Sequence, residues 1–168
     1  MRRETWLADE VEVTVSGAFT THHLLRTGAG ILGESTVPAL RKRAVIRTAE
    51  GRELVMKQTN WWRGTYELQE GDTLLGTVRP LGIFRRENIV RFGHQDYRLR
   101  AVGLWGRLWH LADDAGRTLV EVHRRGIFRR GAILRILSPL DLDLLVFTYH
   151  IVNARWDEQT TAAAAGGS

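Results

Sequence analysis

A segment near the C-terminal end of the chain is apolar on nearly every side when it is drawn as a helix. Its apolar residues run from Leu140 to Val152, and its few polar residues fall on two narrow lines, one of which ends at Arg155. A helix that is apolar all round is buried either in protein or in lipid. Lipid is the poorer choice because the uninterrupted stretch is shorter than the roughly 20 residues that span a bilayer. In addition, Asp141 and Asp143 would each cost roughly 2.5–3.5 kcal/mol near the bilayer centre. We therefore expect the helix to lie inside the protein.

The residues before this segment carry the signals of a helix start. Ser138 is a favourable N-cap, Pro139 suits the first helical position, and Asp141 falls in the first turn beside the positive end of the helix dipole. Asp141 and Asp143 are most simply explained as residues that stabilise this start. The sequence therefore predicts a helix over about 139–156.

Most of the chain before the helix alternates apolar and polar residues with a period of two. From about residue 43 to 137 this alternation is broken by Gly-containing turns about every eight to twelve residues. The pattern is typical of antiparallel strands with one wet face. A curled sheet of ten or more such strands encloses a helix if it closes on itself, and closure also removes unpaired edges. We therefore expect a mainly β fold, with a closed antiparallel barrel around the C-terminal helix.

Length and composition fit one globular domain. The chain has 168 residues, a formal net charge of +5 and no Cys, which excludes disulfides, Cys-ligated zinc and a Cys nucleophile. Its first residues lack the apolar stretch of a signal peptide, so we expect a cytoplasmic protein, with peripheral membrane association as an open alternative. We predict a single domain over 11–156 and a disordered tail over 157–168, because the tail ends in Ala, Gly and Ser.

A five-residue motif occurs twice, each time after a predicted hairpin and before a further strand. The copies are Gly82–Arg86 and Gly126–Arg130, 44 residues apart, and both read Gly-Ile-Phe-Arg-Arg. One interpretation of this internal repeat is a duplicated ligand site, with four arginines beside apolar residues. The other is a duplicated hairpin in which Ile and Phe pack inward and the arginines face water. We favour the second because charge doublets are usually solvated.

The basic residues are almost all arginine, since only Lys42 and Lys57 among the 24 are lysine. Arg binds phosphate and carboxylate through a planar fork, so an Arg-rich surface suits anionic partners; Arg also serves as the outward residue of exposed strands. The candidate contacts to an anionic ligand lie in or beside the repeated motif: Arg85, Arg86, Arg124, Arg125, Arg129 and Arg130.

Familiar catalytic and cofactor motifs do not fit the sequence. The segment Gly28–Gly33 satisfies G-x-G-x-x-G, but no helix follows it, so we predict a Gly-rich strand or turn. His22 and His23 are adjacent and therefore point to opposite faces of a strand, and the other histidines show no ligand spacing. We assign no catalytic residue, no cofactor and no metal site.

Four tryptophans lie near predicted strand ends: Trp61, Trp62, Trp105 and Trp109. Such side chains pack a barrel, lie at a membrane interface or stack on nucleic-acid bases. We predict that at least two of the four pack in the core.

The order of elements resembles the tubby C-terminal-like superfamily, which includes tubby, the plant LURP-one-related proteins, the phospholipid scramblases and many bacterial relatives. The start of the apolar helix is similar to the Pro-Leu-Asp-Leu-Asp start of the scramblase C-terminal helix, and here it reads Pro139-Leu140-Asp141-Leu142-Asp143. The resemblance covers residues 43–156 and begins near Val11. It implies a closed barrel of about twelve strands threaded by the helix, and it points to membrane lipids. Calcium is not carried over, because the matching segment 129–135 has no carboxylate.

These features favour a non-enzymatic binding module. The first hypothesis is peripheral association with anionic phospholipid, or binding of a lipid-like ligand, through the candidate arginines. The alternatives are nucleic-acid binding through the same basic surface, which is steeply salt-dependent, and a scaffold role with a protein partner. An enzyme ranks last because no nucleophile, base and orienting group can be assembled from the sequence.

Overall fold

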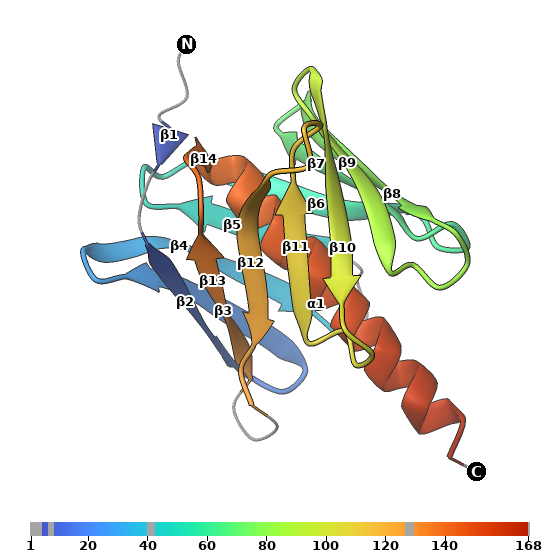
Figure 1. Cartoon of the computed structure of the whole chain (residues 1–168). Coiled ribbons are helices and arrows are strands. Elements are labelled where there is room, and N and C mark those ends of the chain that lie inside the picture. The colour runs from blue at the N-terminus through green and yellow to red at the C-terminus, as the bar shows by residue number, and fades with distance from the viewer. Residues whose placement is uncertain (1–4, 7–8, 40–42, 127–129, 168) are drawn as a thin grey trace.

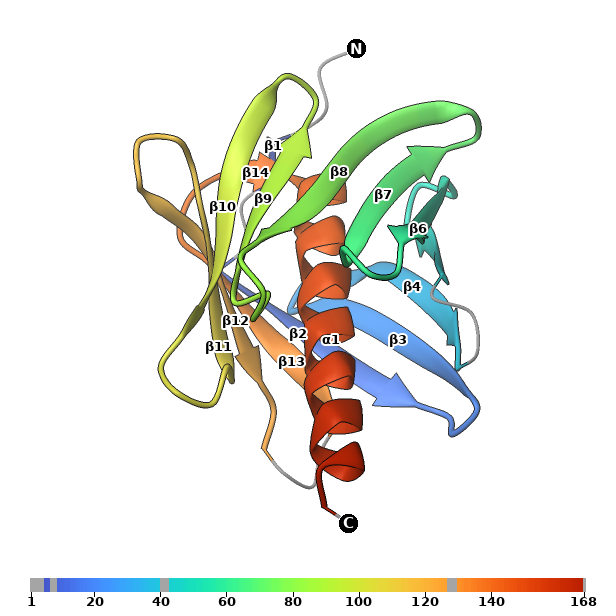
Figure 2. The same cartoon turned by 90° about the vertical axis from the view of Figure 1, so that its right-hand side faces the viewer.

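The computed structural model describes residues 5–6, 9–39, 43–126 and 130–167. Within these residues, twelve antiparallel strands form a closed barrel, and one long helix, α1 (Leu142–Ala165), runs through it (Figures 1 and 2). The chain winds as a meander, and the last barrel strand pairs with the first to close the ring. The barrel strands are β2 (Glu10–Ser16), β3 (Thr20–Thr27), β4 (Gly30–Pro38), β5 (Arg43–Thr48), β6 (Glu53–Asn60), β7 (Thr65–Glu70), β8 (Thr73–Leu81), β9 (Glu87–Phe92), β10 (Gln95–Val102), β11 (Leu108–Ala112), β12 (Thr118–Arg124) and β13 (Gly131–Ile136). The predicted closed barrel around a C-terminal helix is confirmed.

The core lies between the inner face of the barrel and α1. In β5, for example, Ala44 and Ile46 are buried while their neighbours face outward, as a period of two requires. From the other side, α1 contributes an unbroken buried run that includes Phe147, Tyr149 and Ile151. Because strands surround the helix, its apolar residues find partners in every direction.

One glycine of β8 is required by the close approach of the helix. A Cβ atom on Gly76 would lie 3.1 Å from a ring carbon of Phe147 and 3.0 Å from the carbonyl oxygen of Arg91. Any larger residue at this position would push against both the helix and the neighbouring strand. Gly76 therefore lets the barrel wall lie directly against α1.

The helix begins later than the sequence predicted. Leu140 and Asp141 form a short strand, β14 (Leu140–Asp141), which pairs with β1 (Thr5–Trp6) outside the barrel. This pairing keeps the backbone of Asp141 extended (φ −67°, ψ 135°), so Asp141 rather than Ser138 is the N-cap. Its carboxylate accepts a hydrogen bond from the backbone N–H of Asp143 at 2.8 Å. Pro139 accordingly lies before the helix and not at its first position.

The helix also ends later than predicted. It continues through Ala165, so residues 157–165 of the expected disordered tail are helical, and the last turns extend beyond the strands (Figure 2). Ala is the strongest helix former, and four alanines occupy the last turns. The hydroxyls of Thr160 and Thr161 donate back to carbonyls one turn earlier. Among the described residues, no helix combines the length and apolar character needed to cross a bilayer.

A charged cluster closes the end of the barrel at which α1 begins. The Arg52 guanidinium donates to Glu70 at 2.7 and 2.9 Å and to Asp143 at 3.1 and 2.8 Å. These hydrogen bonds, the stronger with Glu70, hold the pKa of Arg52 above its ordinary value. The Asp143 side chain is only 1% exposed, whereas that of Arg52 is 34% exposed. Arg52 therefore fixes the first turn of α1 to β7.

We expect Arg52→Gln to lower the free energy of unfolding by about 2–3 kcal/mol, because it takes the charged partner from a buried carboxylate. The loss stays below that of a fully buried pair because water reaches Arg52. Urea unfolding followed by circular dichroism measures it. Arg47→Gln is the control, since the Arg47–Glu53 pair is 66% and 53% exposed. Its expected change is within about 0.5 kcal/mol, and equal losses in both variants would contradict the assigned role of Arg52.

Candidate functional site

The turns at the end of the barrel where α1 emerges carry exposed apolar side chains. Alternate turns of a meander lie at the same end of a barrel, so the β2–β3, β6–β7, β8–β9 and β10–β11 turns share this end. Of the ten exposed large hydrophobic residues in the described part of the chain, seven lie on these turns. We call these seven the apolar rim: Phe19, Trp61, Trp62, Ile83, Phe84, Leu104 and Trp105. A cluster of this kind marks an interaction surface, whereas single exposed apolar residues are ordinary.

The prediction that at least two of the four tryptophans pack in the core is wrong, because one of them does. Trp109 is completely buried, whereas Trp61, Trp62 and Trp105 are 55%, 82% and 83% exposed. Trp109 lies on β11 and points inward, and its indole N–H donates to the Gly106 carbonyl at 3.0 Å. The other three lie on turns, where no inner face is available to them.

The repeated motif also differs from the favoured interpretation, in which its Ile and Phe pack inward. Ile83 and Phe84 are 86% and 81% exposed. They follow Gly82, whose φ of +74° turns the chain out of β8 before the inward alternation can continue. In the second copy, Ile127, Phe128 and Arg129 lie outside the described residues.

The second arginine of each motif copy binds the backbone of a neighbouring turn. Arg86 donates to the carbonyls of Gly103 and Leu104, the latter at 3.0 Å, and Arg130 donates to the carbonyl of Gly17 at 2.6 Å. In both cases the acceptor turn belongs to the next strand pair around the barrel. We call these contacts the arginine clasps. The two copies of the motif thus share a structural role that the sequence did not indicate.

The remaining described candidate arginines are engaged as well. Arg85 donates to the carbonyls of Trp61 and Trp62 and pairs with Glu158 of α1 at 3.1 Å. The guanidinium of Arg124 lies 5.5 Å from the ring centroid of Trp156, and Arg125 pairs with Glu12. These candidates lie on the β8–β9 turn and at the β12–β13 connection, which begins after Arg124 at the end of β12, with the β10–β11 hairpin between the two groups. The structure therefore does not gather them into one cluster.

A buried arginine that sequence reasoning missed ties α1 to the β6–β7 turn and to the start of β9. Arg155 is 2% exposed and donates to the Gly64 carbonyl at 2.8 Å and to the Asn88 side-chain oxygen at 2.7 Å. Glu158 lies 3.2 Å from the same guanidinium. Burial lowers the pKa of Arg155 from its ordinary value, but an arginine stays charged in a protein. The one available signal was a charged residue on an otherwise apolar helix.

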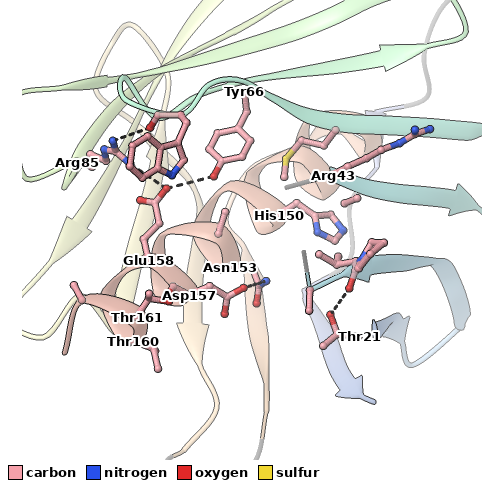
Figure 3. A pocket seen from close by; sticks show the side chains of 18 of the residues that line it. Thr21, Arg43, Tyr66, Arg85, His150, Asn153, Asp157, Glu158, Thr160 and Thr161 are labelled. Atoms are coloured by element: carbon pink, nitrogen blue, oxygen red, sulfur yellow. Dashed lines mark hydrogen bonds and ion pairs between the residues drawn. The ribbon is translucent and has the colours of Figure 1, made fainter. Parts of the chain in front are cut away.

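A groove runs along α1 beside strands β3 to β7, with a volume of about 820 Å³. Figure 3 shows His150, Asn153 and Glu158 on the helix side of this cavity, with Tyr66 and Arg85 on the opposite side. Its lining combines small or apolar residues with polar residues from the outer half of the helix. A second cavity of about 490 Å³ also lies against α1 and shares four lining residues with the first: Thr21, Arg130, Asn153 and Asp157.

A buried cluster of ring side chains closes the inner end of the groove. The Tyr149 hydroxyl lies 2.6 Å from His23 Nδ1, and the His23 and His150 rings are 5.5 Å apart. Burial lowers the pKa of His23 to about 4 and holds the pKa of His150 well below its ordinary value. Burial likewise raises the pKa of Tyr149. Both imidazoles are therefore neutral at physiological pH.

The structure also places the His22–His23 pair and the segment Gly28–Gly33. His22 is exposed while His23 is buried, as opposite faces of β3 require. The segment Gly28–Gly33 forms a turn and the start of β4, as predicted. Within the described part of the chain, no three His, Asp or Glu side chains are grouped to hold a metal ion.

Comparison with known proteins bears on the fold. No protein-family model and no curated protein matches the chain. A solved structure to which it is similar is the X-ray structure of the Arabidopsis thaliana protein AT5G01750. The two share 15% identity over 86% of this chain and 90% of the plant chain, with a TM-score of 0.60. At this identity, the similarity shows a common fold.

We expect Arg86→Gln to speed amide hydrogen exchange in the turn 103–107 about fivefold, because about 1 kcal/mol of clasp hydrogen bonding is lost locally. Hydrogen exchange with mass spectrometry measures this. Arg91→Gln is the matched control, since Arg91 pairs with Asp96 on the barrel exterior and the two side chains are 66% and 46% exposed. If both substitutions leave the turn equally protected, the clasp does not hold it.

The buried histidines predict a stability that falls in acid. In the unfolded chain the imidazole of His23 has a pKa near 6.5, whereas in the folded chain burial lowers this pKa to about 4. The stability that depends on neutral His23 is therefore fully present above pH 6.5 and is lost as the pH falls toward 4. For His23 we expect a loss of about 2 kcal/mol between pH 7.5 and pH 5. Urea unfolding at both pH values should show that this loss of unfolding free energy is smaller in His23→Gln. The loss should be unchanged in His94→Gln, which changes an exposed residue and serves as the control. Equal losses in the two variants would contradict the prediction.

Proposed function

We propose that this chain is a non-enzymatic member of the tubby C-terminal-like superfamily that docks on anionic membrane surfaces through its apolar rim. The barrel threaded by a C-terminal helix, the fold shared with the plant protein and the Pro139–Asp143 segment support the superfamily assignment.

The observation that carries the membrane proposal is the concentration of exposed apolar side chains at one end of the barrel. Three of the seven rim residues are tryptophans, which favour the boundary between water and hydrocarbon. Peripheral binding strengthens with the apolar area that a protein inserts. The rim offers Trp, Phe, Leu and Ile side chains on separate turns around the emerging helix, an arrangement suited to a flat lipid surface.

Charge supports the choice of an anionic surface. The chain carries a formal net charge of +5, and Arg63 and Arg107 are exposed on the same turns as rim tryptophans. A basic residue near an anionic leaflet contributes about 1 kcal/mol of attraction. The candidate arginines also contribute to this proposal. Arg86 and Arg130 donate to neutral backbone carbonyls, so their positive charge is not cancelled by these contacts and remains near the rim.

The test is co-sedimentation with vesicles of phosphatidylserine and phosphatidylcholine, compared with pure phosphatidylcholine. We expect binding to the anionic vesicles only, weakened at least tenfold in the triple variant Phe84→Ser, Leu104→Ser, Trp105→Ser. Removing three large apolar contacts, each contributing about 1.5–3 kcal/mol when fully buried, accounts for such a loss. The matched control is Ile31→Ser, Leu74→Ser, which removes exposed apolar residues near the opposite end of the barrel.

A single-stranded oligonucleotide serves as competitor in the same assay, since exposed tryptophans beside arginines also stack on bases. Vesicle binding that survives the competitor supports the proposal. Oligonucleotide binding that is lost in the triple variant, with no vesicle binding, would replace it with nucleic-acid recognition. Equal vesicle binding by the triple variant and its control would show that the rim is not the membrane contact.

A further inference from the structure

We propose that the groove along α1 binds one long-chain fatty acid, with the carboxyl group at His150 and the acyl chain along the outer half of the helix. The inference rests on the proposed function in one respect, because the rim would bring the open side of the groove to the lipid that supplies the ligand.

The shape of the groove suits a single extended chain. On α1 its lining runs from His150 through Ala154 and Ala162 to Ala165, which lie on one helix face at intervals of four, eight and three residues. At a rise of roughly 1.5 Å per residue, this face is about 22 Å long. The acyl chains of one leaflet fill half of a hydrocarbon core that is about 30 Å thick, so one acyl chain spans about 15 Å. The groove is therefore long enough for one acyl chain.

Apolar surface faces the groove from both the helix and the barrel, beside polar side chains of α1 such as Thr160 and Thr161. The small side chains of Ala154, Ala162 and Ala165 leave space beside the helix, and Ala44 and Met56 provide apolar surface from the barrel. The volume of about 820 Å³ is within the range of small-molecule sites. Two acidic residues line the groove. Glu158 pairs with Arg85 and Arg155, and Asp157, seven residues along the helix from His150, accepts a hydrogen bond from Asn153 at 3.3 Å.

An unsatisfied polar atom marks the inner end. His150 is 2% exposed, its ring lies at the cavity in Figure 3, and its Nε2 has no hydrogen-bond partner among the described residues. A buried polar atom without a partner costs about 1–3 kcal/mol. A neutral imidazole can place a proton on Nε2 and donate it to a carboxylate oxygen. The cavity lining also includes the basic residues Arg43 and Arg130, whose positive charge favours an anionic ligand over a neutral one.

The occupant is a free fatty acid rather than a whole phospholipid, because His150 lies deep among buried rings. The rings of His23 and Tyr149 lie 5.5 and 4.9 Å from that of His150. A carboxyl group is small enough to reach such a position, whereas a phospholipid headgroup is much larger. The acyl chain then points outward along the helix, toward the rim.

The test is calorimetric titration of the full chain with palmitate, below the concentration at which palmitate forms micelles and without vesicles. We expect one palmitate per chain. Its affinity should fall at least tenfold in Ala162→Trp, which fills the groove, and stay unchanged in Ala163→Trp. Ala163 is the adjacent helix position and does not line the cavity, and both positions are exposed, so neither substitution threatens folding. Absence of palmitate binding, or equal affinity in these two variants, would overturn the proposal.

Two further comparisons test the chemistry at His150. His150→Phe, checked for folding by circular dichroism, should lower palmitate affinity at least tenfold, and palmitate methyl ester should bind more weakly than palmitate. Lysophosphatidylcholine with the same chain should bind least. If it binds as tightly as palmitate, the ligand is a phospholipid and the assignment of a free carboxyl group is wrong.

The same titration separates this inference from the proposed function. The triple variant Phe84→Ser, Leu104→Ser, Trp105→Ser changes residues that do not line the groove, so it should keep its palmitate affinity while losing vesicle binding. Palmitate binding without vesicle binding in the unaltered chain would overturn membrane docking alone. Vesicle binding without palmitate binding would overturn the groove assignment alone.

Discussion

The enclosure of α1 on all sides is the constraint on which the rest of the structure depends. A helix that is apolar around its whole circumference cannot be stabilised by one sheet face, because the opposite side would remain in water. A closed barrel covers such a helix on every side, and closure at the same time pairs both edges of every barrel strand. The close packing of Phe147 against Gly76 shows how directly the strands meet the helix. The burial of α1 therefore depends on the closure of the barrel.

The two ends of the barrel carry different kinds of side chain, because the helix begins at one end and emerges at the other. Where α1 begins, Arg52 joins Asp143 to Glu70, and the β1–β14 pair lies beside the start of the helix. Where α1 emerges, the ends of the strands leave two grooves against its sides, and the turns carry exposed apolar side chains. Binding sites commonly lie on loops that a rigid scaffold positions. Within the described residues, both grooves and seven of the ten exposed large apolar residues lie at the end where α1 emerges.

The sequence predicted the barrel and the helix because both follow from periodicity, which a single chain displays directly. It failed where a nonlocal contact overrides a local signal. Ser138 and Pro139 form a strong helix start, yet pairing of Leu140 and Asp141 with β1 moves the start to Leu142. The clasps left no trace in the sequence, because Arg86 and Arg130 bind backbone carbonyls and any residue supplies a carbonyl. Likewise, Ile83 and Phe84 have the composition of a strand and lie on a turn only because of Gly82.

The clasps explain how apolar side chains stay exposed on turns that do not collapse onto the barrel. Arg85, Arg86 and Arg130 tie neighbouring turns together through their backbone carbonyls, and Arg155 fixes the β6–β7 turn and the start of β9 to α1 from within. The backbone of the rim is thus held by polar contacts, and its side chains are left to project outward. Association costs less when the groups that make contact are already in place. The repeated Gly-Ile-Phe-Arg-Arg motif joins both features in one segment, since its apolar residues form part of the rim in the described copy and its second arginine holds the adjacent turn in both copies.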